Sequence, residues 1–181
     1  IPYNELEEKN LTAKDKRAIE KPQKLEAEYR AYLEKEKRIK AVTLCFTDIE
    51  GRFHMLDYDK KFLLTSADNL TFDGSSIRGF TAQSESDLRL TIDWGSIIWL
   101  PSDLFGPGKV IMFANVKRRD KNQYESDFRG VLQEYARELN TKEGLTAYAA
   151  AEIEGFLIEG LNAEQKYNEK IVSHIQYDSE S

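Results

Sequence analysis

The stretch AVTLCFTDIEGRFHM, residues 41–55, has the alternation and the central turn of a β-hairpin. In its first half, apolar residues alternate with threonine and cysteine, which is the period-two pattern of a strand with a buried face. Residues 48–51 interrupt that run with turn-forming residues, and Phe53 and Met55 begin a second extended stretch. The stretch therefore predicts two strands joined by a short turn.

More strands are expected on the C-terminal side. Alternation recurs over residues 88–92, a short buried strand is predicted over 97–100, and a longer one over 110–116 follows a Gly-Pro-Gly turn. Apolar residues at helical spacing predict a helix over about residues 124–140, and a final strand is expected over about 145–158. Several strands with few helices indicate an α+β fold, a mixed sheet with one or two packed helices.

The first 40 residues differ in composition from the rest. They carry 11 basic and nine acidic side chains, a net charge of +2, which leaves −8 for residues 41–181. Pro22 suits the first turn of a helix, so we expect an N-terminal amphipathic helix over residues 22–38, after a mobile lead-in over residues 1–13. Such a helix either docks a partner or, more commonly, covers one edge of a core.

The composition excludes several classes of protein. The 181 residues are 40% hydrophobic, enough to bury a core, and the net charge of −6 argues against an extended nucleic-acid-binding surface. No apolar run approaches the roughly 20 residues of a membrane helix, and the N-terminus lacks the pattern of a secretory signal. Cys45, the single cysteine, lies in an apolar strand and is expected to be an inert core thiol. These features predict a cytoplasmic protein with no nucleic acid or membrane partner.

The first candidate site is residues 69–80, NLTFDGSSIRGF, which we call the glycine loop. It is too polar and too rich in glycine to be expected as a strand, and its glycines permit tight or left-handed backbone. Asp73 and the two serines offer hydrogen bonds, and Arg78 offers a forked cation. Composition alone favours a well-tied surface turn in which Asp73 accepts hydrogen bonds from the amides of Ser75 and Ser76.

The second candidate site is Glu152-Ile153-Glu154 in the expected final strand. Side chains at positions i and i+2 of a strand lie about 7 Å apart on one face, so two carboxylates would lie side by side. That spacing suits hard divalent cations. The same pattern is also common on solvent-facing strands, but the flanking segments are apolar, and buried carboxylates would need a cation or strong hydrogen bonds.

Taken together, these segments resemble the N-terminal part of glutamine synthetase, in particular the class I form of bacteria and archaea. The resemblance is carried by residues 72–80 with Glu85-Ser86-Asp87, by the hairpin residues 46–51, and by Glu152-Ile153-Glu154, all in the family's order. It implies a β-grasp-like domain over residues 41–140, preceded by the charged arm of residues 1–40. Residues 141–181 would then be the truncated start of a catalytic domain.

The resemblance also implies a reaction, in which ATP drives the joining of glutamate to ammonia through γ-glutamyl phosphate, with Mg²⁺ or Mn²⁺ ions. Glu152 and Glu154 would be metal ligands. Asp73 would help to bind ammonium and draw off its proton, with Ser76 beside it in the same pocket. In this family the N-terminal domain completes the active site of a neighbouring subunit, so the expected partner is a second copy in a homo-oligomeric ring.

Two departures from the family pattern are visible. Ala150 stands where the family usually has glycine, and Asp127-Phe128-Arg129 replaces Asp-Pro-Arg. The family's ATP loop and its other metal ligands lie beyond Ser181, so the 181 residues alone are expected to be inactive.

Two alternatives stay open, namely a stand-alone interaction or regulatory protein derived from this domain, and a ligase that joins glutamate to a polyamine or another amine.

Overall fold

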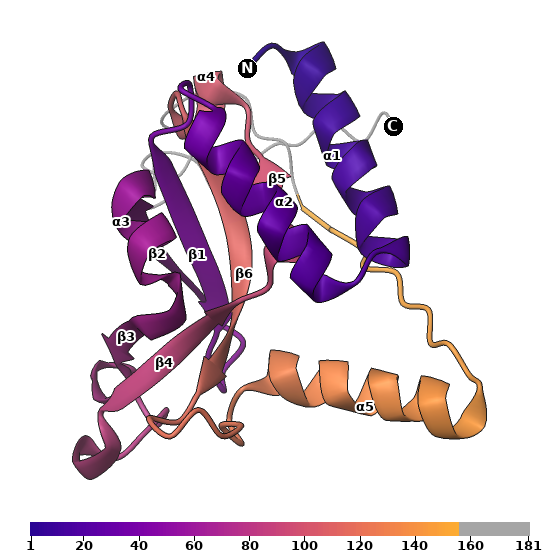
Figure 1. The fold of residues 1–181 in the computed structure, drawn as a ribbon. Helices are drawn as coiled ribbons and strands as arrows, with labels where there is room; N and C mark the ends of the chain where they lie inside the picture. Colours follow the sequence, from indigo (N-terminus) through magenta and orange to yellow (C-terminus); the bar gives the residue numbers. More distant parts are fainter. Residues whose placement is uncertain (156–181) are drawn as a thin grey trace, which may run out of the picture. The chain divides into compact units, whose positions relative to one another are not determined.

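The computed structural model describes residues 1–155, which belong to two units. The first unit comprises residues 1–145 and holds every helix and strand assigned within the described part of the chain (Figure 1). The second unit begins at Thr146 and is treated separately. No helix among the described residues is long and apolar enough to cross a membrane.

A mixed sheet forms the centre of the first unit. Its strands are β1 (Ala41–Thr47), β2 (Phe53–Asp59), β3 (Leu70–Asp73), β4 (Asp87–Ile92), β5 (Ile98–Trp99) and β6 (Lys109–Lys117). The strand order is β2-β1-β6-β4-β3, and β5 pairs with β6 outside this path. Only β1 and β6 run parallel, and the other pairs are antiparallel. The α+β prediction with a β-grasp-like mixed sheet is confirmed.

The hairpin of β1 and β2 forms where the sequence pattern predicts it, but β1 is buried on both faces. In β1, which lies between β2 and β6, the five central residues are all buried, whereas the edge strand β2 keeps one residue in two exposed. In β6, Val110, Met112, Ala114 and Val116 alternate with half-buried residues and are fully enclosed. These side chains face the core, where they meet Leu25, Tyr29 and Leu33 of the α2 helix.

The helices are α1 (Tyr3–Ile19), α2 (Pro22–Lys35), α3 (Lys60–Ser66), α4 (Ser102–Phe105) and α5 (Phe128–Glu143). The first three contact the sheet, its connections or one another, whereas the apolar residues Phe128, Leu132 and Tyr135 of α5 are exposed. Figure 1 shows α2 lying across the sheet, with α1 alongside it. The predicted amphipathic helix is thus confirmed as α2, and it covers the core.

The N-terminal lead-in is where the sequence prediction is wrong. Residues 3–19 form α1, so residues 1–13 are not an unstructured arm. The inner side of α1 is built from Ala13, which is buried, and from Asn10, which bonds to the backbone of Trp99. Small and polar residues at the inner face leave no strong apolar periodicity, which explains why the helix was not predicted.

Three further elements differ from expectation. The glycine loop begins as strand β3, because its first residues pair with β4 from Leu70↔Leu90 to Asp73↔Asp87. The short helix α3 was not predicted, and it begins where the Asp59 carboxylate accepts hydrogen bonds from the amides of Lys61 and Phe62. The α5 helix begins at Phe128 rather than near residue 124, since a turn from Tyr124 to Asp127 precedes it.

The predicted final strand does not form within the described residues. Residues 145–155 are irregular, and Ile153 has 98% of its surface exposed. A strand needs a neighbour for its backbone hydrogen bonds, and no strand of the described chain pairs with this segment. The rest of the predicted strand, residues 156–158, lies outside the described residues.

Candidate functional site

The glycine loop places its acidic residue at the end of an edge strand. Asp73 is the last residue of β3, opposite Asp87 of β4, and a single 3₁₀ turn over Gly74–Ser76 follows it. The side chain of Asp73 is exposed. The loop therefore presents a carboxylate to solvent at the point where the sheet ends.

Both oxygens of the Asp73 carboxylate accept hydrogen bonds from the serines that follow it. Oδ1 accepts from the Ser75 amide at 2.9 Å and from the Ser75 hydroxyl at 2.6 Å, and Oδ2 accepts from the Ser76 hydroxyl at 2.7 Å. The predicted turn is confirmed at the Ser75 amide, while Ser76 reaches the carboxylate through its hydroxyl. The Ser75 and Ser76 hydrogen bonds lower the pKa of Asp73 below its ordinary value, so the group is anionic at neutral pH.

The loop backbone is held by close packing. A Cβ atom at Gly74 would lie 2.6 Å from Cδ1 of Leu88 and 2.8 Å from Cγ2 of Thr81, so only glycine fits there without a shift. Gly79 has φ +71°, in the left-handed region that favours glycine. Phe80, at the end of the loop, is buried against Phe46 and the other aromatic rings of the core. The position of Asp73 is thus fixed by sterics as well as by hydrogen bonds.

The surroundings of the loop are polar. Arg78 is exposed and forms no ion pair with any residue of the described chain. A cavity of about 300 Å³ lies where the loop returns to the sheet, lined by residues 84–88 and 118–120. Its charged members include Glu85, Asp87 and Arg118. The cavity lies beside the glycine loop, and its lining is polar and charged.

Glu152 and Glu154 lie in the second unit, and both are exposed on irregular backbone. Their predicted burial in an apolar strand is therefore not found among the described residues. Within residues 1–155, no group of three or more His, Cys, Asp or Glu side chains could hold a metal ion. Two exposed carboxylates supply fewer oxygens than the six or more that Mg²⁺ or Mn²⁺ needs, so the described residues do not by themselves fit a divalent-cation site.

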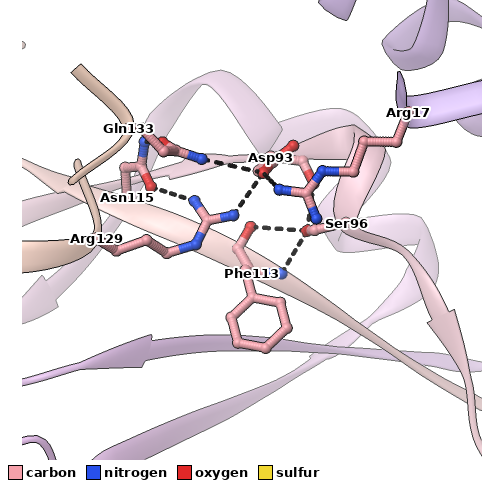
Figure 2. Close-up of polar contacts among 7 residues, drawn as sticks. All are labelled: Arg17, Asp93, Ser96, Phe113, Asn115, Arg129 and Gln133. Carbon is pink, nitrogen blue, oxygen red and sulfur yellow. Dashed lines mark hydrogen bonds and ion pairs between the residues drawn. The ribbon is translucent and has the colours of Figure 1, made fainter. Parts of the chain in front are cut away.

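A second polar cluster, which the sequence analysis missed, surrounds Asp93 (Figure 2). Its Oδ2 atom accepts from Arg129 of α5 at 2.5 Å and from Arg17 of α1 at 3.1 Å. Arg129 also stacks over the ring of Phe113. Two guanidinium groups already satisfy this carboxylate, so the cluster ties helices to the sheet rather than offering a free ligand site.

The hairpin turn holds another pair that was not predicted. Oδ1 of the buried Asp48 accepts from the amides of Glu50 and Arg52, and its Oδ2 lies 2.8 Å from Nε2 of His54. The His54 hydrogen bond is the main reason that the pKa of Asp48 lies below its ordinary value. An aspartate that opens a four-residue turn is a local signal, and it could have revealed the two amide bonds. Cys45 is buried in β1, as expected for a core thiol, and burial raises its pKa to about 11.

A known protein family matches part of this sequence. Residues 38–118 match the family model described as glutamine synthetase, beta-Grasp domain. Glutamine synthetase from Thermotoga maritima is 33% identical over 124 residues, which are 68% of this chain and 28% of the relative. The enzyme from Clostridium saccharobutylicum is 36% identical over 135 residues, 70% of this chain and 29% of the relative. The chain thus spans less than a third of the length of these curated relatives.

Solved structures agree on the fold. Plasmodium falciparum glutamine synthetase, solved by cryo-electron microscopy, aligns with a TM-score of 0.58 at 21% identity, covering 64% of this chain and 22% of that one. GmaS in a complex with ADP aligns with a TM-score of 0.54 at 17% identity, covering 78% of this chain and 36% of that one. Residues 38–118 are therefore similar to the β-grasp domain of glutamine synthetases, and the solved structures agree with this fold.

Proposed function

We propose that this chain is the N-terminal part of a glutamine synthetase-type ligase, which uses ATP to join glutamate to ammonia through γ-glutamyl phosphate. The observation that supports this proposal most strongly is the glycine loop. It holds an exposed, anionic carboxylate at Asp73 with the Ser76 hydroxyl bonded to it, in a family whose relatives are glutamine synthetases. The proposed substrates are glutamate, ammonium and ATP.

Asp73 is proposed to bind ammonium and to accept a proton as the amine attacks. Ammonium has four N–H donors and a positive charge, so a carboxylate that stays ionised is a suitable acceptor. The serine hydrogen bonds keep Asp73 ionised and fix its direction, while its exposed face remains open to a cation. Ser76 is proposed to lie in the same ammonium pocket.

Glu152 and Glu154 are proposed to ligate Mg²⁺ or Mn²⁺. The ion would neutralise charge on the phosphoryl group that is transferred. Because two carboxylates supply only part of a coordination shell, the remaining ligands are proposed to come from outside the described residues. For this reason the 181 residues alone are expected to lack ligase activity.

The active site is proposed to be shared between subunits of a homo-oligomeric ring. The glycine loop of one subunit would complete a site whose metal ligands come from its neighbour. In support, Asp73 lies at an edge strand with its side chain exposed, which leaves the carboxylate accessible to a second copy of the chain.

The proposal is tested by the ammonium dependence of glutamine formation in the full-length gene product that contains this chain. Asp73→Asn keeps the size of the side chain and removes the charge, so the rate at limiting ammonium should fall by about 10²- to 10⁴-fold. Asp68→Asn, in a side chain that is 90% exposed, is the matched control and should retain the wild-type rate. A normal rate for Asp73→Asn at limiting ammonium would contradict the proposal.

A further inference from the structure

We infer that Tyr124 is a positioning residue that holds the glycine loop in the conformation presenting Asp73, an inference that rests on the function proposed above. Tyr124 lies outside the loop, in the connection between β6 and α5. It is 44 residues from Phe80 in sequence, and it contacts that residue directly.

Tyr124 engages the end of the loop through both its hydroxyl and its ring. The hydroxyl donates a hydrogen bond to the backbone carbonyl of Phe80. The ring packs edge-on against the ring of Phe80, with centroids 5.3 Å apart and planes at 78°. Tyr124 is only 4% exposed and Phe80 only 2%, so solvent does not compete with this contact.

A short series of backbone hydrogen bonds connects this anchor to Asp73. The Phe80 amide donates to the Ile77 carbonyl at 3.0 Å, and the Ile77 amide donates to the Gly74 carbonyl at 3.1 Å. Gly74 directly follows Asp73. Displacing Phe80 would therefore disturb two consecutive turns that end next to the carboxylate.

Arg118 supports Tyr124 and ties down the other end of the loop region. Its guanidinium carbon lies 5.7 Å from the centroid of the Tyr124 ring. The guanidinium also binds both oxygens of Glu85 at 3.1 Å, and both oxygens of Glu125 at 2.5 and 2.7 Å. Glu85 lies on the segment that returns from the loop to β4. Residues 118–125 thus contact both the end of the glycine loop, at Phe80, and the segment that leads from the loop to β4, at Glu85.

A phenylalanine at position 124 would fill nearly the same space as tyrosine. The hydroxyl is the part of Tyr124 that directs a hydrogen bond onto the loop backbone, so the substitution Tyr124→Phe isolates its positioning role. Tyr29→Phe is a matched control, because Tyr29 is equally buried but packs edge-on against Trp99 of β5.

The first test is hydrogen exchange of the 181-residue chain. In Tyr124→Phe, the amides of Ile77 and Phe80 should exchange about three- to ten-fold faster, as expected for the loss of one net hydrogen bond. The amides of β1 and β6 should keep wild-type rates, and Tyr29→Phe should leave the loop amides unchanged. Unchanged loop exchange in Tyr124→Phe, or an equal increase throughout the sheet, would overturn the inference.

The second test separates positioning from the proposed function itself. In the full-length gene product, Tyr124→Phe should raise KM for ammonium several-fold while KM for glutamate stays at the wild-type value. An active Tyr124→Phe enzyme with unchanged ammonium dependence would overturn the inference and leave the proposed function intact. A wild-type product with no ammonium-dependent ligase activity would overturn the proposed function, whatever the exchange rates show.

Discussion

Asp127 is the most completely buried carboxyl group among the described residues, with 1% of its surface exposed. Its Oδ2 atom accepts a hydrogen bond from the Val116 amide at 3.0 Å. Gly130 is needed for this approach, since a Cβ there would lie 2.3 Å from Oδ2. Burial outweighs the lowering effect of nearby backbone amides and raises the pKa of Asp127 above its ordinary value of 3.8.

This environment predicts different effects on stability for two substitutions. Asp127→Ala leaves the Val116 amide buried without its acceptor and should lower the free energy of unfolding by about 1–3 kcal/mol. Asp127→Asn keeps an acceptor oxygen and removes the buried charge, so its stability at pH 7 should equal or exceed that of the wild type. Urea unfolding at pH 7 measures both free energies.

The pH dependence gives a second check on Asp127. A carboxyl group whose pKa is higher in the folded state favours folding most when it is protonated. The stability of the wild type relative to Asp127→Asn should therefore be greatest below pH 3.8 and should decline as the pH rises through the folded-state pKa. Parallel stability curves for the two proteins would show that burial does not raise this pKa.

Some side-chain hydrogen bonds of this protein could be predicted from the sequence, and others could not. The hydrogen bonds of Asp73 were predictable because their partners follow within three residues, so the turn geometry is local. The roles of Asp93 and Tyr124 were not predictable. Their partners come from α1, from α5 and from the glycine loop, and only the folded chain brings these segments together.

At the scale of elements, one polar side chain of α1 makes a pair of hydrogen bonds to the backbone of a strand. Asn10 donates to the Trp99 carbonyl at 3.0 Å and accepts from the Trp99 amide at 2.9 Å, in the way that a neighbouring strand would. The short strand β5, which contains Trp99, also pairs with β6. The Asn10 side chain therefore connects α1 to the sheet. Ala13, on the same helix, is buried as part of the core.

We expect Asn10→Ala to loosen α1. Two backbone groups at Trp99 lose their partners, so the free energy of unfolding should fall by about 1–3 kcal/mol and the fluorescence of Trp99 should change. Leu11→Ala, at the adjacent and exposed position, is the control and should change both quantities little. Circular dichroism of the two variants checks whether helix content is lost only in Asn10→Ala.

The elements with clear apolar periodicity were predicted well, namely α2, the β1–β2 hairpin, β4, β5 and β6. In α2, β4 and β6 one regular face is buried, which is the property that periodicity records. The helix α1 escaped prediction because polar residues dominate it. The strand β3 escaped prediction because it has only four residues and directly precedes the polar, glycine-containing turn of the loop, so its pairing with β4 determines its structure. The strand expected over residues 145–158 had the right residue types, yet it has no pairing partner among the described residues.

At the scale of the whole molecule, the proposal assigns the loop and the metal ligands of one site to different subunits. Full-length subunits carrying Asp73→Asn and full-length subunits carrying Glu154→Gln should each be nearly inactive. When the two are dissociated, mixed and reassembled, some sites receive a native Asp73 from one subunit and a native Glu154 from another. Activity should therefore return in the mixture, as measured by glutamine formation.

If both residues served a site within one subunit, every site in the mixture would still carry one substitution. The mixture would then be no more active than either variant alone. Each variant dissociated and reassembled by itself serves as the control for the treatment.

The most direct test of the central claim compares two nitrogen nucleophiles in the full-length gene product. Ammonia is protonated at neutral pH and must lose a proton before it attacks, whereas hydroxylamine is a weaker base that arrives uncharged. If Asp73 binds ammonium and takes its proton, Asp73→Asn should lose about 10²- to 10⁴-fold of the rate with ammonium and only a few-fold with hydroxylamine. Equal losses with both nucleophiles, or no loss with ammonium, would contradict the role assigned to Asp73.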